Sequence, residues 1–189
     1  MSRLHVLADR PRLALGALLT LLLAAAAVVG SGADFTASSA NPSNTFASGT
    51  LTIGNSNEGT AVLSATGLRP GGPAANGTVD IQNTGTLSGG FTVSRSTPVD
   101  SGSTNPLSDK LNLTIVDCGK FVGATAPTCD GGDPTTYSGT IAAMTGSQAL
   151  GTYAGGEQHR YEFTVALDSS AGNAYQGGSS SVTFDWNAA

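Results

Sequence analysis

The residues of this chain that could activate a nucleophile or bind a metal are few and widely spaced. One histidine, His159, follows the first 33 residues, and the sequence holds no HExxH motif and no Cys/His cluster. A catalytic zinc needs about three protein ligands, and a serine triad needs a histidine that an acid orients. We interpret His159 as lying on the polar side of its strand, solvated. The sequence therefore predicts no catalytic residue, no metal ligand and no cofactor.

Cys118 and Cys129 are the only cysteines of the chain. An even number in an exported chain favours one disulfide, and two free thiols are the alternative. Asp130 and Asp133 follow in "CDGGDP", and carboxylate oxygens are ligands that calcium prefers. Two acids fall far short of a calcium-binding loop, so we expect a disulfide-closed loop followed by a plain turn.

The N-terminus has the order of residues that is typical of a secretory signal peptide. A basic start is followed by an apolar run over 13–29 and by small residues that end at Ala33. We expect cleavage between Ala33 and Asp34, with Ala40 as a weaker second site. A retained membrane anchor is the alternative, because the apolar run approaches the roughly 20 residues that a membrane span needs.

Cleavage would leave residues 34–189, which is enough for one domain. We divide the chain into a signal helix at 1–33, an N-terminal extension at 34–48 and a folded domain at 49–189. After residue 33 the chain has five basic and twelve acidic residues, a net charge of −7. This balance argues against nucleic acids and anionic membranes as partners. Only 11% of residues are charged, which is typical of an all-β extracellular domain rich in Gly, Ser and Thr.

Alternating apolar and polar residues predict about eight short strands separated by Gly, Pro and Asn turns. The clearest alternation lies at 111–116, at 160–167 and in the last strand, where Val182, Phe184 and Trp186 share one face. We also expect a strand at "TAVLSA" from Thr60, a helical turn at 106–110 and a turn at "LGTYAGGEQ". The pattern fits a jelly-roll-like two-sheet β-sandwich.

Several segments together resemble the TasA/camelysin family of secreted bacterial proteins. The segments are "NTFASGTLTIG" after the signal peptide, "GLRPGGPAANGTVDIQNTGTLSGGFTV", "DKLNLTIVDCG", "LGTYAGGEQHRYEFTVAL" and "NAYQGGSSSVTFDWNA". Their order spans nearly the whole chain after the signal peptide. The resemblance implies export with a signal peptidase of the SipW type and a jelly-roll-like sandwich that acts outside the bacterial cell.

Members of the TasA type polymerise into biofilm matrix fibres, in which each subunit lends an N-terminal strand to the next. The resemblance therefore implies self-association into filaments, with a donor strand within 34–46 and with Phe35 or Phe46 as its apolar anchor. Pro42 has no N–H to give to a ladder, so we expect the donor strand in one half of this segment. The alternative is a frayed terminus.

Two rival functions remain open at this stage. Camelysin-type members are described as surface metallopeptidases, but the single exported histidine leaves a metal without an evident ligand set. A monomeric binding module for glycan or protein would expose aromatic residues on one face, with Tyr137, Tyr153 and Tyr175 as candidates. We favour a secreted structural protein over both, without nucleic acid as partner and without membrane attachment after cleavage.

Overall fold

The computed structural model describes residues 15–22 and 47–189. The first range is a short helix in which the Thr20 hydroxyl donates to the carbonyl oxygens of Gly16 and Ala17, at 3.1 and 2.9 Å. No helix within the described residues combines the length and the apolar character that crossing a membrane takes. The predicted cleavage point at Ala33 and Asp34, the anchors Phe35 and Phe46, and most of the 34–48 extension lie outside the described residues.

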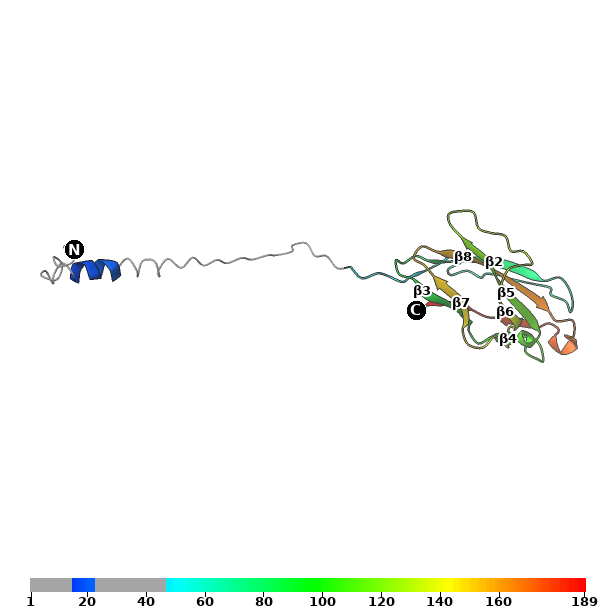
Figure 1. The fold of residues 1–189 in the computed structure, drawn as a ribbon. Helices are drawn as coiled ribbons and strands as arrows, with labels where there is room; N and C mark the ends of the chain where they lie inside the picture. Colours follow the sequence, from blue (N-terminus) through cyan, green and yellow to red (C-terminus); the bar gives the residue numbers. More distant parts are fainter. Residues whose placement is uncertain (1–14, 23–46) are drawn as a thin grey trace. The chain divides into compact units, whose positions relative to one another are not determined.

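Residues 47–189 form an all-β domain of antiparallel sheets, which confirms the predicted sandwich (Figure 1). The first sheet has the strand order β1-β2-β8-β5-β6, the second has β10-β3-β7, and a small third sheet pairs β4 with β9. The first sheet comprises β1 (Ile53–Asn55), β2 (Ala75–Asn83), β8 (Gln158–Leu167), β5 (Leu111–Phe121) and β6 (Thr135–Thr140). The others comprise β10 (Phe184–Ala188), β3 (Gly89–Arg95), β7 (Gln148–Tyr153), β4 (Val99–Ser101) and β9 (Ser179–Ser181).

The apolar side chains of alternate residues meet between the two larger sheets. Along β8 the side chains of Tyr161, Phe163 and Val165 are buried, whereas those of Arg160 and Glu162 are only partly covered. Burying every second side chain is what a strand with one solvated face requires. The core also takes large side chains from β5, the neighbour of β8 in the first sheet, and from β3 and β7 of the second sheet: Phe91, Val93, Leu113, Ile115 and Tyr153.

Two predicted elements differ in the structure. "LGTYAGGEQ" begins within β7, because a bulge admits Gly151 at a φ of 105°, a conformation that only glycine adopts at low cost. The run from Thr60, predicted as a strand, belongs to no strand.

The predicted helical turn at 106–110 is confirmed as the 3₁₀ turn η2 (Leu107–Asp109). A second such turn, η3 (Asn173–Tyr175), precedes β9.

Candidate functional site: an apolar groove beside an edge strand

The two main sheets differ in width, and this leaves part of the core face uncovered. The first sheet has five strands and the second has three. At one side of the second sheet, β10 pairs with β3, and no strand of the described residues lies on its other side. A groove of about 1240 Å³ opens there. The sandwich thus carries a gap at the place where a further strand of the second sheet would lie.

The groove is lined by polar and apolar side chains in similar measure, and its apolar part belongs to the core or packs against it. The apolar part is formed by side chains from both sheets and from the turns between them: Leu107, Leu111, Ile141, Val165, Leu167, Phe184 and Trp186. Phe184 packs edge-on against buried Phe163, with ring centroids 4.8 Å apart, and Trp186 packs against the same ring at 6.1 Å. Two aromatic side chains of β10 therefore reach into the groove from a rigid core, and an apolar side chain that entered would find a preformed surface.

Two segments of mostly small and uncharged residues form the walls. They are residues 59–70 and most of residues 171–184. Arg69 is the one charged residue among the described residues that line the groove. Walls of this composition suit an uncharged extended chain better than an ionic ligand, because a buried charge would find almost no partner there.

The backbone of β10 offers unpaired hydrogen-bonding groups on the groove side. Ala189 and Gly90 exchange both backbone hydrogen bonds, at 2.8 and 3.0 Å, and Ser96 donates to the carbonyl oxygen of Thr183 at 2.9 Å. In an antiparallel ladder such pairs alternate with pairs whose backbone groups point outward. The N–H and C=O groups of Phe184 and Trp186 therefore point away from β3. An exposed edge of this kind is a template for pairing with another strand.

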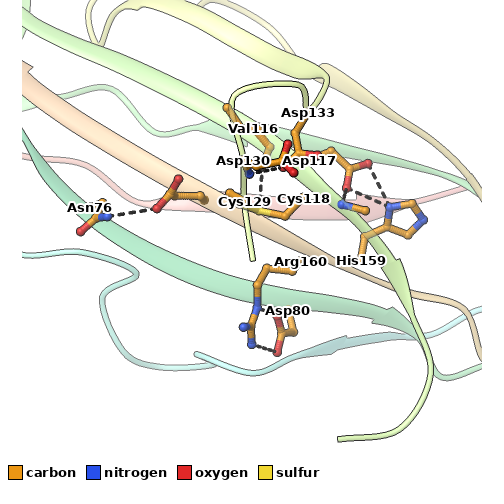
Figure 2. Close-up of a disulfide and its surroundings, with 12 residues drawn as sticks. Asn76, Asp80, Val116, Asp117, Cys118, Cys129, Asp130, Asp133, His159 and Arg160 are labelled. Carbon is orange, nitrogen blue, oxygen red and sulfur yellow. Dashed lines mark hydrogen bonds and ion pairs between the residues drawn. A yellow bond between two sulfur atoms is a disulfide. The ribbon is translucent and has the colours of Figure 1, made fainter. Parts of the chain in front are cut away.

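At another place in the domain, His159 belongs to a cluster of polar side chains, and the prediction that it is solvated is wrong. Its side chain is only 15% exposed. Nδ1 lies 2.9 Å from Oδ2 of Asp117, and Nε2 lies 3.3 Å from Oε1 of Glu157 (Figure 2 shows the first contact). The ring also stacks on that of Tyr153, with centroids 4.4 Å apart. Side chains alternate between the two faces of a strand, and His159 lies two residues before buried Tyr161. The alternation along β8 therefore places His159 on the inner face.

This arrangement defines what His159 can do chemically. Burial lowers its pKa, but the hydrogen bond and the charge of Asp117, followed by those of Glu157, outweigh burial and raise the pKa above 6.5. Both ring nitrogens contact carboxylates, so neither is open to a metal ion or to a serine hydroxyl. Within the described residues, His159 therefore acts as a partner in a salt-bridge cluster. The hydroxyls of Tyr153 and Tyr161 hydrogen bond to each other beside it, and burial raises the pKa of both phenols.

Cys118 and Cys129 form the predicted disulfide (Figure 2). Cys118 lies at a bulge in β5, where Asp117 pairs with Tyr161 and the next paired residue is Gly119. Asp133 lies near the two sulfur atoms, but sulfurs joined in a disulfide are not thiolate ligands for a metal.

The two acids after the disulfide build the turn that follows it. Oδ2 of Asp133 accepts a hydrogen bond from the backbone N–H of Asp130 at 2.8 Å. Oδ1 of Asp130 accepts one from Gly132 at 3.1 Å. The carboxylates thus have local backbone partners, as turn-forming aspartates commonly do.

The three tyrosines proposed for an exposed aromatic face do not form one. Tyr153 is buried in the core. Tyr137 and Tyr175 are half-buried and pack against the core, and the Tyr137 hydroxyl donates to the carbonyl oxygen of Thr140 at 2.7 Å. The feature that could accept a ligand is instead the groove beside β10. This groove could not be predicted from the sequence, because no local pattern shows which strand lies at a sheet edge.

Comparisons with known protein families, with curated proteins and with solved structures find no match to this chain. The function has to be argued from the geometry of the groove and from the sequence.

Proposed function

We propose that this chain is a secreted structural subunit that assembles into extracellular or cell-surface fibres. Each subunit donates a strand from residues 34–46 to the groove of the next. The observation that carries the proposal is the apolar groove beside the unpaired edge of β10. A strand added there would gain backbone hydrogen bonds from β10 and bury an apolar side chain against Phe184 and Trp186.

The sequence of the segment suits this groove. Asp34 is the one charged side chain of the 34–46 segment, and residues 35–46 have none, in keeping with groove walls whose one charged residue is Arg69. Phe35 and Phe46 are eleven residues apart, about 36 Å in an extended chain, whereas the five residues of β10 span about 17 Å. One groove therefore takes one of the two. Pro42 divides the segment, and the half before it is the longer one and contains Phe35, so we assign the donor strand to 34–40 and the linker to the residues after it.

Donation to a neighbour is favoured over donation to the chain's own groove. The side chain of Leu51 and the backbone of Ala189 both approach Gly89, so the chain enters the domain beside the C-terminal end of β10. A segment that folded back from there along its own β10 would have to run parallel to it. A neighbour's segment can run antiparallel, which is the more stable pairing.

The cellular location rests on three supports. The N-terminal residues have the order of a signal peptide, the disulfide requires an oxidising compartment to form, and the chain resembles the TasA/camelysin family. A camelysin-like metallopeptidase finds less support, because both nitrogens of His159 contact carboxylates.

The test is assembly of the chain that begins at Asp34, followed by electron microscopy and sedimentation. We expect filaments above a critical concentration and none after removal of 34–46. Phe35→Ala should raise the critical concentration about tenfold or more, because an anchor leaves the groove, and Phe46→Ala, the same truncation in the same segment, should change it less than about twofold. Filaments that survive the removal of 34–46 would contradict strand donation. A chain that stays monomeric at high concentration would favour the monomeric binding module.

A further inference from the structure

One wall of the groove contains a stretch of backbone without hydrogen-bond partners. Residues 61–66 line the groove but belong to no helix or strand, and none of their N–H or C=O groups has a hydrogen-bond partner within the described residues. Val62 and Leu63 nevertheless pack against the core. Ala61, Ser64 and Thr66 are exposed to water. Val62, Leu63 and Ala65 are half-buried, and a buried backbone group without a partner loses its hydrogen bond to water.

A close contact fixes this segment in the layer of the second sheet. Gly77 of β2 faces the core, since it lies two residues before buried Val79. A Cβ atom at Gly77 would overlap the carbonyl oxygen of Val62 and would lie 2.9 Å from Cβ of Leu63. The segment therefore crosses the inner face of the first sheet at a position that only glycine permits. Both this segment and β10 line the groove.

We propose that residues 61–66 are the second acceptor edge of the groove. This inference rests on the proposed function, and the occupant is the 34–40 segment of a second copy. When that segment enters, it pairs with β10 on one side and with residues 61–66 on the other, and 61–66 becomes a strand. The sequence "AVLSAT" supports this, because Val and Thr favour strands and Val62 and Leu63 already pack against the core. As a strand, the segment would keep one of these two side chains on the core face.

The completed sheet removes the mismatch between the two layers. Its order would be β7, β3, β10, the donated strand and then 61–66, so that five strands face the five strands of the first sheet. Backbone groups on both sides of the donated strand would then be paired. A donor held on two edges is retained more strongly than one added to a single edge, which is what a long-lived fibre needs.

Amide hydrogen exchange on the chain that begins at Asp34 tests the second edge, with fibres compared against dilute monomer. In fibres we expect Phe184 and Trp186 to become protected, and alternate amides within 61–66 to slow at least about tenfold, because one side of that segment gains partners. Fibres that protect Phe184 and Trp186 but leave 61–66 exchanging as in the monomer would overturn the second edge and keep strand donation. Fibres without new protection at Phe184 and Trp186 would overturn the proposed function itself.

A substitution provides the second test. Gly77→Ala should push Val62 away from β2 and raise the critical concentration about tenfold, because the second edge moves. Gly90→Ala is the matched control, since it is also in a strand and its nearest new contact would be an ordinary 3.8 Å. Equal assembly by the two variants would contradict the proposal.

Discussion

The charge of His159 contributes to the stability of the domain, because the imidazole is held between Asp117 and Glu157. Its pKa is higher in the folded chain than the ordinary 6.5. A group with a raised pKa stabilises the fold while it is protonated. The contribution is therefore complete below pH 6.5 and is lost as the pH rises through the folded-state pKa. Glu157 has the opposite sign: the hydrogen bond from the N–H of Ala154 is the main cause that lowers its pKa below 4.5, so its contribution is lost as the pH falls through that lower value.

The raised pKa of His159 predicts how a substitution there should depend on pH. We expect His159→Gln to lower the free energy of unfolding most near pH 6, and the difference from the parent should shrink as the pH rises. Urea unfolding at a series of pH values measures it. Lys120→Gln is the control, because Lys120 is 75% exposed, its nitrogen is 3.9 Å from Glu157, and exposed pairs of this kind contribute little. A difference that grows with pH would contradict the assignment.

For His159, the sequence contains part of the information needed to predict its surroundings. The period of two that placed Tyr161 and Phe163 in the core also places His159 on the inner face, so the burial of His159 could have been predicted from β8. Its partners could not. Asp117 reaches His159 across a bulge in β5, and neither the bulge nor its position is written in a local pattern.

Among the elements, the strands with strict alternation were the predictable ones. β8 and β5 were expected from their apolar period, and both lie at the centre of the first sheet. The predictions were wrong where tertiary packing outweighs the strand or turn propensity of the residues. Residues 60–65 have strand-like composition, but within the described residues their one backbone hydrogen bond is the local one from Thr60 to Asn57. The glycine in β7 predicts a turn, but Gly151 forms a bulge within the strand.

The disulfide should stabilise the domain, because it closes a short loop that begins within β5. Cys118 and Cys129 are eleven residues apart. Replacing both by serine should lower the free energy of unfolding by about 2–3 kcal/mol, since the unfolded chain regains the freedom that the closed loop removes. The urea midpoint should fall with the slope nearly unchanged, and reduction of the parent should reproduce it. Unchanged stability in the double variant would show that the loop is held by other contacts.

Across the whole domain, the two main sheets end at unpaired edge strands, and the groove lies beside one of them, β10. The groove is built from segments far apart in the sequence, from Thr60 to Trp186. They supply its apolar side chains, its walls and the unpaired edge of β10. The composition and the period of the chain predicted an all-β sandwich, but the unequal widths of the two sheets decide where the gap lies. The width of a sheet depends on which strands become neighbours, and the sequence of a single strand does not show this.

The most direct test of strand donation mixes two variants that are each defective in one half of the contact. One lacks residues 34–40, so it keeps the groove. The other carries Val182→Arg, which puts a charge into the groove wall while the donor segment stays intact. Trp186, the only tryptophan of the chain, lines the groove and reports its occupation by fluorescence, while sedimentation gives the size of the complex. We expect each variant alone to be a folded monomer. The mixture should give a one-to-one complex in which Trp186 emission is shifted to shorter wavelength. Two folded variants that remain separate when mixed, or a chain without residues 34–40 that still polymerises alone, would contradict it.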